Sequence, residues 1–235
     1  MADSTGRGVL FDVDGTLVDT NYLHTLAWWQ AFRRFGHDAP MAGIHRAVGM
    51  GGDKLIGHLL GADRDASEDG ELESTHAAVY SSYWPSIRRF EGARELLQRC
   101  AADGLTVVLA SSSSTQEVTV MREIIDADDV IAGATSSSDA EHSKPSPDIL
   151  TAALDSAGLR AENSVFVGDA VWDVLAASEL GIPTIAVLSG GTSAAELREA
   201  GAVEVYADVA QLLAAFEGSA LSQLPGPQEQ RRPDS

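Results

Sequence analysis

The sequence has few of the residues that build covalent or membrane-spanning structure. Cys100 is its single cysteine, which excludes an intramolecular disulfide and a metal site made of cysteines. Because Cys100 shares an apolar stripe with Leu96 and Leu97, we expect a buried core thiol rather than a nucleophile. No apolar run approaches the ~20 residues needed to cross a bilayer. The first residues, MADSTG, also lack the basic and apolar regions of a secretory signal.

Positive charge is also scarce. The 235 residues include 16 Lys and Arg against 35 Asp and Glu, for a net charge of −19. A chain this acidic repels nucleic acids and anionic membranes, so we expect neither as a partner. Together with the missing signal sequence, this favours a cytoplasmic location. The composition leaves the oligomeric state open.

Short apolar runs alternate with amphipathic segments along most of the chain. The runs are too short for helices and rich in β-branched residues, and they predict strands at residues 9–11, 105–110, 129–132, 164–167, 184–188 and 204–206. The segments between and after them predict helices at residues 92–102, 114–125, 147–157, 171–180, 193–200 and 209–216. This alternation indicates an α/β fold with a Rossmann-like parallel sheet and helices on both faces.

The alternation stops directly after the first strand. Residues 19–85 show no strand pattern, only helical patterns at 23–35, 53–60 and 68–83 separated by glycines and a proline. We therefore expect a helical lobe, residues 19–85, inserted into an α/β core made of residues 1–18 and 86–216. Residues 217–235 contain three prolines and little apolar content, and we expect a disordered tail there.

The end of the first predicted strand carries two carboxylates, Asp12 and Asp14, followed by Gly15. Residues two apart in a strand share a face, so both carboxylates can leave the strand end together. Gly15 permits a tight turn there. Ligands of open α/β sheets bind at the carboxyl ends of strands, so this pair is a candidate site. The alternative is an Asp-Gly turn with two solvated acids.

Three later segments place polar side chains at the same edge of the predicted sheet. Four serines follow the second strand, and among them Ser111 and then Ser112 are the candidates for an anion contact, although serines there also cap helices. Lys144 lies just before a predicted helix, where the ordinary alternative is a surface lysine. Asp169 and Asp173 lie four apart at a strand-to-helix junction and can both face the strand end.

An aspartate pair, a hydroxyl, a lysine and a second aspartate pair therefore follow in order at strand ends. This order resembles the haloacid dehalogenase (HAD) superfamily, with its DxDG[TV] motif, Ser or Thr, Lys and GDxxxD-type segment. The resemblance covers residues 7–216 and implies that the helical lobe is a cap domain. It implies that Asp12 is the nucleophile that forms an aspartyl-phosphate, and that Asp14 is the general acid and base. Ser111 would bind a phosphoryl oxygen, and Lys144 would offset negative charge.

The same resemblance implies a metal ion. Asp12, Asp14, Asp169 and Asp173 sum to −4, and Lys144 returns the total only to −3. Like charges ~4 Å apart repel by about 4 kcal/mol at an effective dielectric of ~20, so a phosphate dianion needs a divalent cation beside it. Mg²⁺ prefers oxygen ligands and bridges phosphate oxygens. We expect Mg²⁺ on Asp12, the backbone carbonyl of Asp14 and Asp169, with Asp173 binding directly or through water.

Substrate choice is expected to depend on the cap. Arg46 and Lys54 flank a glycine-rich stretch that suits an anionic or hydroxylated small molecule, and His24 is expected near the entrance of the site. Ser112 is a further candidate for contact with substrate. The alternative for this stretch is an ordinary helical connection with solvated charges, and His24 could instead be a packed or exposed helix residue.

Three functions remain in competition. The acid at Asp14 favours phosphoryl chemistry over dehalogenation, so the leading hypothesis is a Mg²⁺-dependent phosphatase. Its partner would be a small phosphorylated metabolite such as phosphoglycolate or a sugar phosphate. A sugar phosphomutase of the β-phosphoglucomutase type shares all four motifs and is the alternative. A non-catalytic binding protein of this fold is disfavoured because no acid of the motifs is missing.

Overall fold

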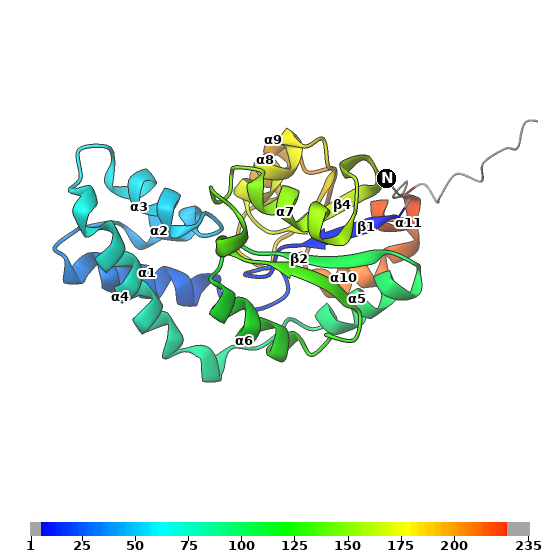
Figure 1. Ribbon diagram of the computed structural model, residues 1–235, viewed down its shortest axis with the longest axis horizontal. Coiled ribbons are helices and arrows are strands. Elements are labelled where there is room, and N and C mark those ends of the chain that lie inside the picture. The colour runs from blue at the N-terminus through cyan, green and yellow to red at the C-terminus, as the bar shows by residue number, and fades with distance from the viewer. Residues whose placement is uncertain (1–5, 225–235) are drawn as a thin grey trace, which may run out of the picture.

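The computed structural model describes residues 6–224 and contains a six-stranded parallel sheet with helices on both faces (Figure 1). Its strands are β1 (Gly8–Phe11), β2 (Thr106–Ala110), β3 (Ile131–Thr135), β4 (Ser164–Gly168), β5 (Thr184–Val187) and β6 (Glu204–Tyr206). The strand order is β3-β2-β1-β4-β5-β6, with every pairing parallel. The predicted α/β fold class is confirmed.

Strand β1 lies in the middle of the sheet and is buried on both faces. Val9 and Phe11 belong to one hydrophobic cluster and Leu10 to another, because successive side chains of a strand point to opposite faces. The first cluster includes residues of α5 (Ala93–Ala102), α6 (Thr115–Ile125) and α10 (Val209–Ala214). The second includes residues of α7 (Asp148–Ala157) and α8 (Val171–Glu179), and α9 (Ala194–Ala200) packs beside α8. No helix within residues 6–224 is long and apolar enough to cross a membrane.

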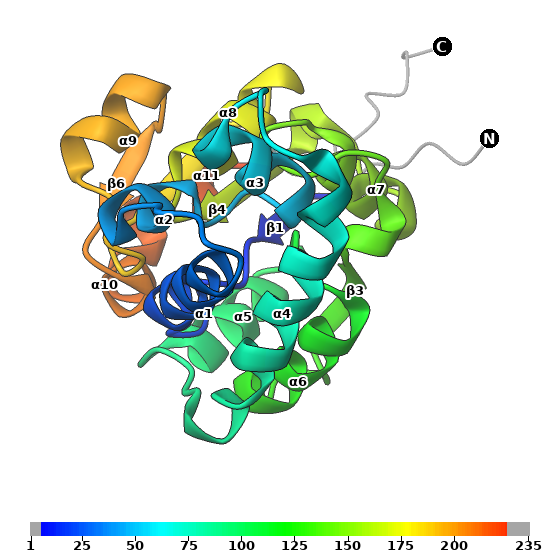
Figure 2. The same cartoon turned by 90° about the vertical axis from the view of Figure 1, so that its left-hand side faces the viewer.

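Four helices lie between β1 and α5 and to one side of the sheet (Figure 1). They are α1 (Asn21–Arg34), α2 (Met41–Ala47), α3 (Gly52–Leu60) and α4 (Asp69–Ser81), and we refer to residues 21–81 as the helical insertion. The insertion has a hydrophobic cluster of its own, which includes Trp28, Phe32, Ile44, Leu55 and Leu72. Helices α1 and α4 lie side by side, as Figure 2 shows from the insertion's own end. The three helices expected here are present, and α2 is an additional short helix.

The third strand lies later in the chain than predicted. The sequence pattern places it at residues 129–132, whereas β3 spans Ile131–Thr135. Its pairing with β2 carries the strand on through Gly133 and Ala134, which have little intrinsic preference for β structure. The bounds of this edge strand therefore follow from its neighbour.

The C-terminal segment is folded further than predicted. A disordered tail was expected over residues 217–235, but residues 216–218 form a helical turn and α11 spans Ala220–Gln223. The tail prediction is wrong for residues 217–224, because Phe216, Leu221 and Leu224 all join the main hydrophobic cluster. Residues 225–235 lie outside the described residues.

This packing predicts a stability effect at Leu221, which is fully buried. We expect Leu221→Ala to lower the free energy of unfolding by about 2–5 kcal/mol, because it removes apolar contacts and leaves a cavity. The matched control is Gln223→Ala on the same short helix, where the side chain is exposed and the change should stay within about 0.5 kcal/mol. Urea unfolding checks both values. Equal stability of the two variants would contradict the packed C-terminal segment.

Candidate active site

The carboxyl end of β1 forms the centre of the candidate site. The backbone N–H of Asp12 still donates to Val167 of β4 at 2.9 Å, so Asp12 continues the sheet before the chain turns. The turn passes through Gly15 at φ +75°, where a Cβ would lie 2.4 Å from Asn21. The left-handed backbone and this close approach both require glycine. The turn thereby directs Asp12 and Asp14 to the same end of the sheet.

Lys144 is fully buried beneath this strand end. Its Nζ lies 2.6 Å from Asp12 Oδ1 and 2.8 Å from Asp173 Oδ1, and it donates to the carbonyl oxygen of Ala110 at 3.1 Å. Burial alone would lower the pKa of Lys144, but the two carboxylates outweigh it and raise that pKa above its ordinary value. Lys144 is therefore a charged ammonium shared by two acids from different elements, and the surface-lysine alternative is wrong.

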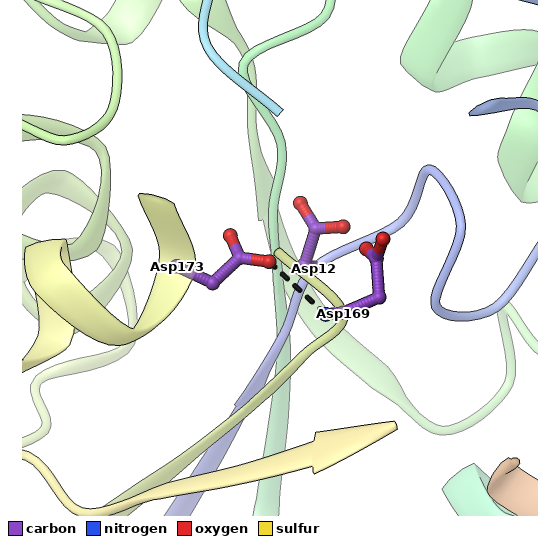
Figure 3. Close-up of side chains that lie close together, drawn as sticks. All are labelled: Asp12, Asp169 and Asp173. Atoms are coloured by element: carbon purple, nitrogen blue, oxygen red, sulfur yellow. Dashed lines mark hydrogen bonds between the residues drawn. The ribbon is translucent and has the colours of Figure 1, made fainter. Parts of the chain in front are cut away.

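Asp169 and Asp173 come from the junction of β4 and α8. One oxygen from each of Asp12, Asp169 and Asp173 lies within 4.8 Å of the others, and all three side chains are buried (Figure 3). The second oxygen of Asp173 accepts the backbone N–H groups of Asp169 and Ala170 at 3.1 and 3.0 Å. Asp169 in turn accepts hydrogen bonds from Thr16 at 3.1 Å and Asn21 at 2.8 Å. Each carboxylate is thus oriented by neighbours.

The three buried acids carry more negative charge than the protein compensates. Burial raises the pKa of Asp12 to about 7 despite Lys144, and Asp173 and Asp14 add to the shift. Burial, together with Asp173 and Asp12, raises the pKa of Asp169 well above its usual range. A buried cluster of carboxylate oxygens with unrelieved repulsion is the donor set that Mg²⁺ prefers. The residues therefore fit a divalent cation.

Asp14 has a different environment from the other acids. It accepts hydrogen bonds from Thr20 at 2.7 Å, Ser113 at 2.8 Å and the Nε2 of His24 at 3.1 Å. Burial would raise the pKa of Asp14, but His24 and these hydrogen bonds lower it to about 2. Asp14 is therefore a carboxylate at rest and is held beside Asp12 by three donors.

Helices α1 and α4 of the insertion meet at a pair of histidines behind Asp14. His24 Nδ1 lies 3.1 Å from His76 Nε2, and the His24 ring stacks on Tyr80 at 3.8 Å. Burial lowers the pKa of both rings, but Asp14 outweighs it for His24, whose pKa is raised, while the pKa of His76 falls well below its usual value. The Nε2–H of His24 thus donates to the Asp14 carboxylate, and His24 Nδ1 and His76 Nε2 share one hydrogen bond.

A cavity of about 390 Å³ lies between the insertion and the sheet edge. Asp12, Asp14 and His24 line it, together with the segment 48–53 of the insertion and the serines 112–114 that follow β2. A small molecule placed here would touch both the carboxylates of β1 and the helices of the insertion.

Most of the predicted site residues lie around this cavity, but the serines after β2 make contacts that differ from the predicted ones. Ser111 is fully buried and its Oγ accepts the backbone N–H of Ser113 at 3.0 Å, so it supports the loop and does not line the cavity. Ser112 lines the cavity, and its Oγ has no hydrogen-bond partner within residues 6–224. Ser113, which was not among the predicted site residues, donates to Asp14.

The two cations expected to face substrate lie elsewhere. Arg46 pairs with Glu196 of α9 on the outside of the molecule, with its side chain 66% exposed. Lys54 lies on α3, and neither residue lines the cavity. The expectation for both residues is corrected because α2 and α3 turn these positions away from the interior of the site.

Sequence reasoning missed several contributing residues, namely Thr16, Thr20, Asn21, His76 and Ser113. Thr16 directly follows the Asp12–Gly15 motif and was within reach of local reasoning. Nothing in the sequence distinguishes Asn21 or His76 from other polar helix residues, because their partners are 148 and 52 positions away.

Comparison with known proteins assigns the family. A family model for haloacid dehalogenase-like hydrolases matches residues 9–187. The chain belongs to this family. It is 29% identical to a phosphoglycolate phosphatase of Rhodospirillum rubrum, over 88% of this chain and 89% of the relative. A crystal structure of a hydrolase from Pseudomonas syringae is 30% identical and has a TM-score of 0.86, covering 90% of this chain and 98% of that one. A β-phosphoglucomutase of Clostridium difficile, 18% identical, shares the fold with a TM-score of 0.79 over 93% of this chain and 98% of that one.

The buried lysine of this hydrolase generates a stability prediction. Lys144→Met leaves Asp12 and Asp173 without their cation, and breaking a buried pair in this way costs about 3–5 kcal/mol. We expect the free energy of unfolding to fall by this amount at pH 8 in excess EDTA, and by less at pH 5. Without the ammonium, the pKa of Asp12 rises further above its value in the unfolded chain, so the folded state binds more protons and its stability falls as pH rises.

The matched control is Lys54→Met, a half-buried lysine with no ion pair among the described residues, which should change stability by less than about 0.5 kcal/mol. Denaturant unfolding at the two pH values measures both variants. A Lys144→Met loss of the same size at pH 5 and pH 8 would rule out the charge argument.

Proposed function

We propose that this hydrolase is a Mg²⁺-dependent phosphatase that cleaves a small phosphorylated metabolite through an aspartyl-phosphate on Asp12. One observation carries the proposal: Asp12 lines the cavity beside Asp14, while Lys144 holds one of its oxygens from below. A nucleophile, an acid–base group and a fixed cation are thus assembled at one strand end. The relative named phosphoglycolate phosphatase supports the same class of reaction.

In the first step, the Asp12 oxygen that Lys144 does not hold attacks phosphorus. A P–O bond to the carboxylate forms as the ester P–O bond breaks, and the leaving oxygen takes a proton from Asp14. At rest this proton lies on the adjacent His24, whose Nε2 faces Asp14 at 3.1 Å. The histidine is therefore the proton source of the acid step.

In the second step, a water molecule attacks the phosphorus of the aspartyl-phosphate. Asp14, now a carboxylate again, takes a proton from that water, and the bond between phosphorus and the Asp12 oxygen breaks. Inorganic phosphate leaves and Asp12 is regenerated. Thr20 and Ser113 hold Asp14 in place for both steps through their hydroxyl groups.

We assign the metal to Asp12, Asp169 and the backbone carbonyl of Asp14. Asp173 is the weaker candidate for direct coordination, since one oxygen contacts Lys144 and the other accepts two backbone N–H groups. When bound, Mg²⁺ supplies positive charge against the phosphoryl oxygens. The helical insertion, within the proposed cap of residues 19–85, completes the site by covering it.

A phosphatase fits the cavity better than the alternative phosphomutase. A sugar phosphomutase must hold a second phosphate group away from the reacting one, which calls for cations on the cap side of the site. Among the described residues that line the cavity there is no lysine and no arginine, and His24 of the insertion is already paired with Asp14. The likeness to a β-phosphoglucomutase concerns the fold.

The nucleophile assignment is tested by Asp12→Asn. The amide keeps the shape but cannot form the acyl phosphate, so we expect kcat for p-nitrophenyl phosphate to fall at least about 10³-fold. Asp19→Asn is the matched control, because Asp19 is exposed on the same segment and outside the cavity. Thermal unfolding confirms that both variants fold. Residual Asp12→Asn activity within tenfold of the parent would remove Asp12 from the nucleophile role.

Metal dependence is tested by chelation. We expect EDTA to abolish hydrolysis of p-nitrophenyl phosphate and Mg²⁺ to restore it, with Ca²⁺ a poor substitute because it prefers more ligands at longer distances. Asp169→Asn should raise the Mg²⁺ concentration for half-maximal activity more than Asp173→Asn does. Full activity in excess EDTA would be incompatible with the proposed centre.

A further inference from the structure

Carboxylates dominate the part of the cavity beyond the reacting groups. Asp53 and Glu73 line it from the insertion, and Glu117 and Glu141 line it from the core. Lysine and arginine are absent from its described lining. We refer to the part of the cavity lined by these four acids as the upper cavity. Lys144 is buried below Asp12 and is paired with both Asp12 and Asp173, so it does not neutralise the acids of the upper cavity.

No lysine or arginine pairs with these four acids among the described residues, and only Glu117 acts on a nearby basic side chain, that of His24. Glu117 accepts from the backbone N–H and hydroxyl of Ser114 at 2.8 Å, and Asp53 accepts from Ser143, both neutral donors. Within residues 6–224, no ion pair involves any of the four. Burial and the neighbouring Asp53 and Asp69 raise the pKa of Glu73, as expected for an uncompensated carboxylate.

Two of these acids lie close to the backbone of glycines that also line the cavity. A Cβ on Gly52 would lie 2.7 Å from Glu73 Oε1, and one on Gly51 would lie 2.8 Å from Asp53 Oδ1. Both carboxylates thus pack against bare backbone at the cavity wall. Larger residues at either glycine would push them away.

Two further polar groups in the wall have no partner in the described chain. His76 is more than nine-tenths buried and lines the cavity, and no hydrogen-bond partner of its Nδ1 lies among the described residues. The buried Oγ of Ser112 is likewise unpartnered. Trp28, Met50 and Leu55 complete an otherwise apolar wall. The cavity therefore offers hydrogen bonds to a substrate oxygen and negative charge beyond it.

Building on the proposed function, we infer that the preferred phosphoester carries a positive charge on its organic part, as in an amino-alcohol or amino-sugar phosphate. The phosphoryl group is matched by Lys144 and the proposed metal, and the His24 ring in the lining is already paired with Asp14. A second anion would therefore meet the field of Glu117 and of the exposed Asp53, Glu73 and Glu141, which repels an anion and attracts an ammonium group. A carboxylate-bearing ester such as phosphoglycolate is disfavoured in this cavity.

Three esters of nearly equal size test the inference: 2-aminoethyl phosphate, 2-hydroxyethyl phosphate and 2-phosphoglycolate, with p-nitrophenyl phosphate as the reference. All are assayed with the full-length enzyme and Mg²⁺. We expect kcat/KM to be highest for 2-aminoethyl phosphate, lower for 2-hydroxyethyl phosphate and lowest for 2-phosphoglycolate. The ratio of kcat/KM for the amino ester to that for phosphoglycolate should be at least tenfold. A ratio of one or below, with p-nitrophenyl phosphate hydrolysed, overturns the inference and leaves the proposed function standing.

Variants separate the cavity charge from the intrinsic reactivity of the esters. The double substitution Glu73→Gln, Glu141→Gln removes two exposed charges and should lower the ratio at least fivefold, while Glu73→Lys should raise kcat/KM for phosphoglycolate. The matched control is Glu71→Gln on the same helix, outside the cavity, with the ratio unchanged within twofold. Thermal unfolding verifies that each variant folds.

The remaining outcomes are decisive as well. A ratio that the double variant leaves unchanged overturns the inference, because the charge of the wall then plays no part in selection. If none of the four esters is hydrolysed, p-nitrophenyl phosphate included, both the proposed function and the inference fail.

Discussion

The organisation of the site depends on the buried ion pair between Lys144 and Asp12. The end of β1 and the junction of β4 with α8 bring one carboxylate oxygen each of Asp12, Asp169 and Asp173 within 4.8 Å of one another, and the repulsion between these carboxylates opposes folding. Lys144 contacts two of these acids at 2.6 and 2.8 Å and so makes their proximity tolerable. One ammonium does not balance three carboxylates. The remaining negative charge keeps the pKa values of Asp12 and Asp169 high and favours a divalent cation.

The helical insertion contributes chemistry to the site as well as covering it. Its first helix supplies His24, which donates to Asp14, and its last helix supplies His76, which shares a hydrogen bond with His24. Asp14, the proposed acid–base group, is thereby linked to the packing of α1 against α4, the two helices that lie side by side in Figure 2. Asp12 is set by the sheet and Asp14 by both parts of the chain. A change in how the insertion packs would therefore alter the position of Asp14 more than that of Asp12.

The residues that define the family and the residues proposed to select substrates by their charge lie in different parts of this molecule. The residues that make it a haloacid dehalogenase-like hydrolase lie at the strand ends, within the matched region 9–187. The charge of the upper cavity comes from side chains such as Glu73 and Glu141, which face the site from α4 and from the loop after β3. Relatives can share the first set and differ in the second, since a fold and its motifs do not determine what the surrounding walls recognise.

The sequence alone was enough to predict the parallel α/β core, the inserted helices and the meeting of Asp12, Lys144 and Asp169, because short apolar strands carry their motifs to a common edge. Only the tertiary structure could show that Ser113 donates to Asp14 and that Ser111 is buried away from the cavity, since the direction of a side chain after a strand end depends on the loop backbone. The structure also revealed His76 and turned Arg46 outward. Which face of a helix looks into a cavity is decided by packing against elements distant in sequence, and local patterns do not encode it.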